Sequence, residues 1–164
     1  MPNPAPKRHV VDLSAQLAHA SHVLATRMAA AFAEIDITPR AFCVLFHALE
    51  AERTQIQLAE IADLDKTTMV VTVDELEKAG LAERRPSATD RRARIVSVTP
   101  AGEQAVARGA KIADWVHREA LASLPAGERE IFAAALLRLV DEGGHLSTPV
   151  ESERGVRRSR QPRK

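Results

Sequence analysis

The stretch that decides the fold is LAERRPSATDRRARIVSVT, residues 81–99. It predicts two short strands joined by a basic tip, and it follows directly on a predicted helix that stops at Gly80. We expect the tip to carry five arginines against a single acid, Asp90. These arginines are Arg84, Arg85, Arg91, Arg92 and Arg94. Such a tip suits a nucleic-acid duplex, because arginines on a loop can enter a narrow minor groove.

The segment before the hairpin predicts a short helix. Thr54 and Gln57 have the spacing of a capping box, in which the threonine caps the helix and the glutamine bonds back to the cap. The helix that follows is expected to turn Leu58, Ile61 and Ala62 toward the core. It is short, because the polar residues that come after it predict a turn.

A second helix is predicted over residues 65–79, with Asp65 as its N-cap at the end of a tight turn. Its apolar residues Met69, Val73 and Leu76 are four and three positions apart, which places them on one buried face. Two short helices joined by about three residues are the signature of a helix-turn-helix.

Longer helices are predicted on both sides of this motif. Two Thr-Pro pairs, Thr38-Pro39 and Thr99-Pro100, are typical helix starts, with threonine as N-cap and proline as the first helical residue. The predicted long helices cover residues 10–35, 39–49, 100–124 and 126–143. The predicted fold is therefore mainly α with a small β-hairpin, a winged helix-turn-helix flanked by long N- and C-terminal helices.

Composition and charge limit the class of protein. The 164 residues suit one domain, and 45% apolar residues suffice for a core. No run of about 18 apolar residues is present, so we expect no membrane span. The N-terminus lacks the apolar region of a secretory signal, and the single cysteine, Cys43, fits a reducing compartment, so a cytoplasmic protein is expected.

Two basic segments stand out against a net charge of only +1. Residues 147–164 carry six basic side chains and two acids, which makes this tail +4 and leaves −3 for the rest. Residues 84–94 are again +4. Such patches, rather than the net charge, determine where nucleic acid can bind. Residues 1–9 are proline-rich and are predicted to be a disordered arm, as is the tail.

The outer face of the second short helix is the candidate reading surface. It is expected to expose Thr67, Val70, Val71, Asp74 and Lys78. It offers no Arg, Asn or Gln for a bidentate base contact, although threonine and valine methyls can contact thymine methyls, and a helix N-terminus favours a phosphate. The candidate DNA contacts are Lys66, Thr67, Thr68, Val71, Thr72, Arg91, Arg92 and Arg94. In the alternative interpretation this is an ordinary surface helix, and the arginines pair with Asp74, Glu75, Glu83 or Asp90.

Several segments together resemble the multiple-antibiotic-resistance regulator (MarR) family. They are LAEIA at 58–62, DKTT at 65–68, VDELEKAGL at 73–81, Asp90-Arg91-Arg92, VSVT at 96–99, and Gly102. The resemblance implies a homodimeric bacterial transcription factor, most often a repressor of an inverted-repeat operator. It implies a regulator domain over 10–146, a DNA-binding core over 39–99, dimerisation helices over 10–36 and 100–143, and an Arg92 that enters the minor groove.

Three positions depart from the family pattern. Asp63 stands in the turn where glycine is common, and it must adopt a left-handed conformation. Val71 replaces a frequent arginine, which shifts DNA contact toward the wing and the backbone. Asp74 can pair with the wing arginine, which would give Arg92 a partly structural role.

The family resemblance also implies a small, often aromatic, acidic effector that releases DNA. The candidate pocket residues are His19, His22, Phe42, Phe46 and Trp115. Solvated helix histidines and a tryptophan in the dimer interface are the alternatives. Cys43 is interpreted as an inert buried thiol, with a redox-responsive regulator as the alternative.

The remaining expectations concern other function classes. No cofactor or metal is expected, and no nucleophile elbow, phosphate loop or zinc spacing indicates an enzyme. A winged helix that binds only proteins is the competing function.

Overall fold

The computed structural model describes residues 12–87, 93–141, 143–144 and 146. The predicted arm and tail, with Val10, Asp90, Arg91 and Arg92, lie outside these residues. The described part is mainly helical with one antiparallel hairpin, as predicted. Its elements are α1 (Leu13–Phe32), the 3₁₀ turn η1 (Ala33–Ile35), α2 (Pro39–Glu50), α3 (Gln55–Ile61), α4 (Lys66–Lys78), β1 (Ala82–Pro86), β2 (Arg94–Val98), α5 (Pro100–Leu121) and α6 (Ala126–Val140). The chain divides into two compact units, residues 1–120 and 121–164.

Side chains just before the helices fix where the helices begin. Asp12 accepts a hydrogen bond from the N–H of Ala15 at the start of α1, and Thr38 accepts one from Ala41 at the start of α2. Between these helices Asp36 adopts a left-handed conformation with φ 54°. Pro39 occupies the first turn of α2, as predicted.

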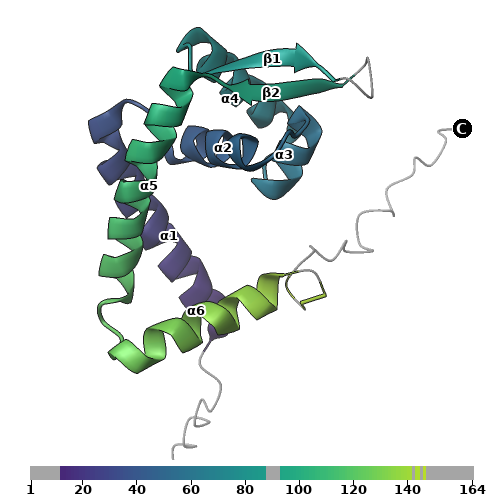
Figure 1. The fold of residues 1–164 in the computed structure, drawn as a ribbon. Helices are drawn as coiled ribbons and strands as arrows, with labels where there is room; N and C mark the ends of the chain where they lie inside the picture. The colour runs from purple at the N-terminus through teal and green to yellow at the C-terminus, as the bar shows by residue number, and fades with distance from the viewer. Residues whose placement is uncertain (1–11, 88–92, 142, 145, 147–164) are drawn as a thin grey trace, which may run out of the picture. The chain divides into compact units, whose positions relative to one another are not determined.

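Helix α2 forms the centre of the core in the first unit. It contacts α3, α4 and β2 (Figure 1). Val44 and Leu45 are fully buried on α2, and Leu58 of α3 and Val73 of α4 are fully buried against the same core. Each fully buried side chain of this size contributes about 1.5–3 kcal/mol relative to exposure, so the helix-turn-helix is held together by its own core.

The predicted helix-turn-helix is present with its capping residues. Thr54 and Gln57 form the capping box of α3, and Asp65 caps α4. Asp63 takes the left-handed conformation with φ 51°, as the turn requires. The inward placement of Ile61 was wrong, since this side chain is 45% exposed. Ala59 and Ala62 pack on the core beside Leu58 instead, because they fall on one side of it around the helix while Ile61 falls on the other.

The hairpin follows a Schellman motif at the end of α4. Gly80, with φ 70°, donates its N–H to the carbonyl of Glu77, and Leu81 donates to that of Leu76. Strands β1 and β2 then pair antiparallel, from Ala82 with Val98 to Pro86 with Arg94. The placement of Arg84, Arg85 and Arg94 at the tip was wrong. The strands are longer than expected, so these three residues lie within β1 and β2.

Helix α5 packs closely against the base of the hairpin. Thr99 accepts a hydrogen bond from the N–H of Gly102 and donates its hydroxyl to the carbonyl of Gly80. Gly102 is buried so tightly that an added Cβ would lie 2.1 Å from the carbonyl oxygen of Leu81. The helix ends at Leu121, three residues before the predicted end at Leu124.

The second unit contains α6, all of whose residues are described. None of them is buried. Its exposed apolar side chains are Ile131, Phe132, Leu136, Leu137, Leu139 and Val140. No helix in the described part of the chain combines the length and apolar character needed to cross a bilayer.

Candidate nucleic-acid interface

The outer face of α4 is exposed, as predicted. Lys66 and Thr67 are exposed in its first turn, and Val70 and Val71 are exposed in the next. Val71 is the more open of the two valines, with 48% of its surface exposed against 36%. The opposite face carries the buried Met69 and Val73, so α4 cannot rotate without exposing core.

Two threonines predicted to contact DNA are used within the protein. Thr72 is buried, and its hydroxyl donates a 2.8 Å hydrogen bond to the carbonyl of Thr68. Its assignment as a DNA contact was therefore wrong, because it lies beside Val73 on the inner face of α4. Thr68 is half-buried, and its hydroxyl donates to Asp65 at 2.5 Å.

Asp65 fills the N-terminus of α4. Its carboxylate accepts the backbone N–H groups of Thr67 and Thr68 at 2.9 and 3.0 Å. Hydrogen bonds from the Thr68 hydroxyl and from these N–H groups hold the pKa of the Asp65 carboxyl below its usual range. This terminus is therefore already bound to an anion, which contradicts the expectation that it favours a phosphate.

Arg84 ties the hairpin to both helices of the motif. From β1 its guanidinium pairs with Asp74 of α4 at 2.7 Å and also with Glu77. Its Nε donates to the side-chain carbonyl of Gln55, in α3, at 3.2 Å, and its backbone N–H donates to Glu77 at 2.7 Å. Sequence reasoning missed Gln55 and Glu77. The only sequence signal for Glu77 was the Gly80 stop, which turns β1 back along α4.

The other described arginines of the hairpin lie at the surface. Arg85 pairs with Glu83 on its own strand, and both are exposed. Arg94 is exposed at the start of β2. For Arg84 and Arg85, pairing with surface acids was the correct interpretation, although the partner of Arg84 beside Asp74 is Glu77 rather than Glu75. Arg91 and Arg92 lie outside the described residues.

Known proteins share this arrangement of two short helices and a hairpin. The family model of the MarR family matches residues 35–93, which include the whole helix-turn-helix and β1. The segment that holds the helix-turn-helix and β1 is therefore similar to the MarR family. A MarR-family protein from Rhodococcus sp. RHA1 that shares the fold is described as a transcriptional regulator.

Solved structures of other regulators share the fold. A probable transcriptional regulator from Pseudomonas aeruginosa is 29% identical, with 78% of this chain and 96% of that chain covered and a TM-score of 0.71. The transcriptional repressor CouR bound to a 23-mer DNA duplex is 26% identical, with 78% and 91% covered and a TM-score of 0.69. CouR from Rhodococcus jostii RHA1 bound to p-coumaroyl-CoA is 23% identical, with 85% and 96% covered and a TM-score of 0.71.

The five residues predicted for an effector pocket do not line one cavity. His19 and His22 are exposed on α1, and Phe42 stacks between Phe32 and Phe46 with ring centroids 5.1 and 5.8 Å away. Of these five, only Trp115 lines a cavity of about 580 Å³. The other residues that line this cavity are Arg27, Ala30, Ala31, Glu34, Ile112, Val116 and Glu119. This cavity lies between α1 and α5.

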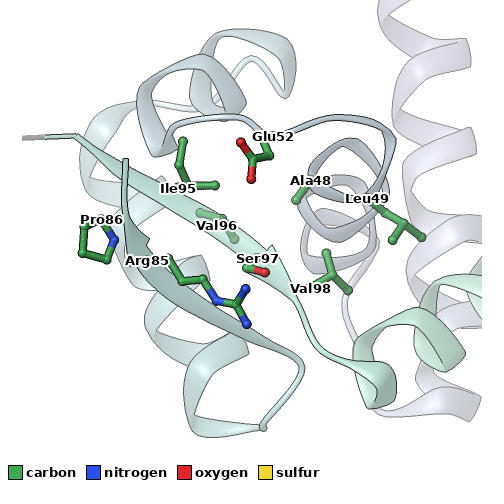
Figure 2. Close-up of a pocket in the computed structure, with 9 residues that line it drawn as sticks. All are labelled: Ala48, Leu49, Glu52, Arg85, Pro86, Ile95, Val96, Ser97 and Val98. Carbon is green, nitrogen blue, oxygen red and sulfur yellow. The ribbon is translucent and has the colours of Figure 1, made fainter. Parts of the chain in front are cut away.

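A smaller cavity, of about 260 Å³, lies where the hairpin meets the end of α2 (Figure 2). Ala48 and Leu49 line it from α2, and Val96 and Val98 line it from β2. Its charged residues are Glu52 and Arg85, and Arg85 already pairs with Glu83.

The described residues offer little for redox or metal chemistry. Burial raises the pKa of the Cys43 thiol, which disfavours the reactive thiolate and supports the interpretation as an inert thiol. No group of three metal-ligating side chains comes together among the residues described.

Proposed function

We propose that this regulator is a homodimeric repressor that binds duplex DNA at an inverted repeat. The observation that carries the proposal is that a single chain presents the outer face of α4 beside a hairpin fixed by Arg84. α4 would enter the major groove and the hairpin the adjacent minor groove. CouR, which shares this fold, is a repressor described in complex with a DNA duplex.

The proposed contacts follow from what the structure leaves exposed. Lys66 and Thr67 would reach phosphates or base edges from the first turn of α4, and Val71 would face base edges. Thr68 would contribute less, because its hydroxyl already bonds to Asp65. Arg91, Arg92 and Arg94 of the hairpin would contact phosphates and the minor groove. Two-fold symmetry would place the half-sites about 10–10.5 base pairs apart.

Selection from random duplex DNA tests this function. The purified full chain is incubated with the pool at near-physiological salt, and the bound duplexes are sequenced. Enrichment of an inverted repeat is the expected result. A folded protein that enriches no motif would overturn specific reading and favour the competing function, a winged helix that binds proteins.

The contribution of the hairpin is tested separately by salt dependence. Arg92→Ala should weaken binding at most sites and reduce the slope of log K against log salt by about one. Arg118→Ala, on the exposed surface of α5, is the control and should leave the slope unchanged. An unchanged slope for Arg92→Ala would remove this residue from the proposed interface.

We further propose that a small aromatic acid releases the regulator from DNA by binding between α1 and α5. Trp115 offers an aromatic face and Arg27 a positive charge there, while Glu34 and Glu119 restrict a carboxylate to the side of Arg27. CouR is described with p-coumaroyl-CoA, which contains an aromatic acyl group.

The effector proposal is testable by fluorescence, because Trp115 is the only tryptophan of the chain. Salicylate and p-coumarate should quench its emission, and the quenching ligand should weaken binding to the selected duplex. Arg27→Ala should weaken the quenching. Quenching that leaves DNA affinity unchanged, or no quenching by either acid, would contradict this proposal.

A further inference from the structure

We propose that α4 obtains base specificity chiefly by contact between the side chain of Val71 and thymine C5-methyl groups in the major groove. The inference rests on the proposed DNA binding and names the chemistry that the helix would recognise. It makes an apolar contact, rather than bidentate hydrogen bonding, the principal means of reading on this helix.

Val71 is placed for such a contact. It is 48% exposed on the outer face of α4, although it is a large apolar side chain. Thr67 lies four residues earlier, so its methyl group shares the same helical face. Val70, at the neighbouring position of the face, is less open, with 36% of its surface exposed. Val71 is therefore the apolar group most open to a groove.

The polar side chains that usually read bases are either missing from the motif or already engaged. α4 contains no Arg, Asn or Gln. In α3, the side-chain carbonyl of Gln57 accepts the N–H and hydroxyl of Thr54 at 2.9 and 3.0 Å. That of Gln55 accepts from Arg84. To make the two-bond contact with adenine, either glutamine would have to share or give up these internal hydrogen bonds.

The acids near the face are satisfied within the protein as well. Asp74 pairs with Arg84, and Asp65 accepts the N–H groups of Thr67 and Thr68. Lys66 and Thr67 are the polar side chains exposed in the first turn, and Val70 and Val71 follow them. The charged residues Asp74, Glu75 and Lys78 are exposed further along the helix, away from the N-terminal end that contacts base edges in a helix-turn-helix.

The methyl group of thymine is the partner that an apolar side chain can read. In the major groove, thymine is the base that adds a methyl group to its hydrogen-bonding edge. Covering one methyl group is worth about 0.8 kcal/mol, which corresponds to a roughly fourfold change in affinity. Replacement of thymine by uracil removes this methyl group and leaves the hydrogen-bonding pattern intact.

The experiment uses the full chain and a duplex recovered by selection. Each thymine of one half-site is replaced in turn by uracil, and affinity is measured at fixed salt. We expect a three- to fivefold loss at one or two positions in the major groove, and no loss at thymines in the flanking sequence. In Val71→Ala the same positions should lose most of their preference for thymine over uracil. Val71→Thr, which keeps one methyl group, should retain part of it.

The outcomes separate this inference from the proposed function. Tight, specific binding with no uracil-sensitive position would overturn the inference and leave the proposed function standing. Uracil sensitivity that persists in Val71→Ala would assign the contact to another residue and overturn the role of Val71. Failure to select any duplex would remove both. Because Val71 is exposed, melting of Val71→Ala should match that of the wild type, which excludes a folding defect.

Discussion

The stretch from α2 to β2 and the helix α6 use their apolar residues in opposite ways. In the first region Val44, Leu45, Leu58 and Val73 are fully buried, and caps and a Schellman motif close the helix ends. In α6 no residue is buried, and Ile131 is 66% exposed. The helix-turn-helix is therefore shaped by one chain, whereas the large apolar side chains of α6 are exposed. A second copy is the occupant that the proposed homodimer supplies.

The largest difference between the regions should come from core truncation. Leu45→Ala removes a fully buried side chain and should lower the free energy of unfolding by about 2–5 kcal/mol, measured by urea denaturation. Leu136→Ala, on the exposed face of α6, should cost much less at high protein concentration but make the melting temperature fall more steeply on dilution. Equal losses of stability in the two variants at every protein concentration would contradict the distinction between a core residue and a residue of a dimer interface.

Two glycines, Gly102 beside the hairpin and Gly127 in α6, differ in the same way between a packed and an open environment. In Gly102→Ala the new Cβ would meet the Leu81 carbonyl at 2.1 Å and Val98 at 2.6 Å, so unfolding should become easier by about 1–3 kcal/mol. Gly127→Ala in α6 meets nothing within 4 Å and should stabilise by about 0.5 kcal/mol through helix propensity. Thermal melting would contradict the packing argument if Gly102→Ala raised stability.

The arginines of β1 should differ more modestly. Arg84→Ala breaks a half-buried network with Asp74, Glu77 and Gln55, and we expect a loss of about 1–2 kcal/mol. Arg85→Ala removes an exposed pair with Glu83 and should change stability by less than about 0.5 kcal/mol. Chemical denaturation of the two variants measures this. Similar losses would show that Arg84 does not anchor the hairpin.

The smallest effect should be the pH dependence of the α4 cap. The pKa of Asp65 is lowered in the folded state, so its stabilising contribution is present above the unfolded pKa of about 3.9 and is lost as pH falls through the folded value. Asp65→Asn keeps a capping side chain that does not titrate in this range. The melting temperature of the wild type relative to Asp65→Asn should therefore fall between pH 5 and pH 3. A difference that stays constant over this range would contradict the role of the carboxylate.

Features encoded by neighbouring residues could be predicted from the sequence. The caps Thr38, Thr54, Asp65 and Thr99 bond to groups two or three residues away. The winged helix-turn-helix was predicted for the same reason. Its helix caps and turns are determined by residues that lie close together in the sequence. The left-handed conformation of Asp63 was expected from the family resemblance, in which glycine is common at this turn.

Features that depend on packing between elements could not be predicted in this way. The Arg84 bond to Gln55 joins residues 29 positions apart. Thr72 was misplaced because a threonine in a helix can bond to the carbonyl four residues earlier and so be buried without loss. The pocket residues were chosen by type, and only Trp115 lies at a cavity of the kind expected.

The stoichiometry of the specific complex tests the account most directly. Sedimentation of the full chain with a selected duplex measures how many chains bind each inverted repeat. We predict two chains per duplex, bound together, with Leu136→Ala requiring a higher protein concentration for the same complex. One chain bound per duplex at saturation, with full affinity and no effect of Leu136→Ala, would contradict it.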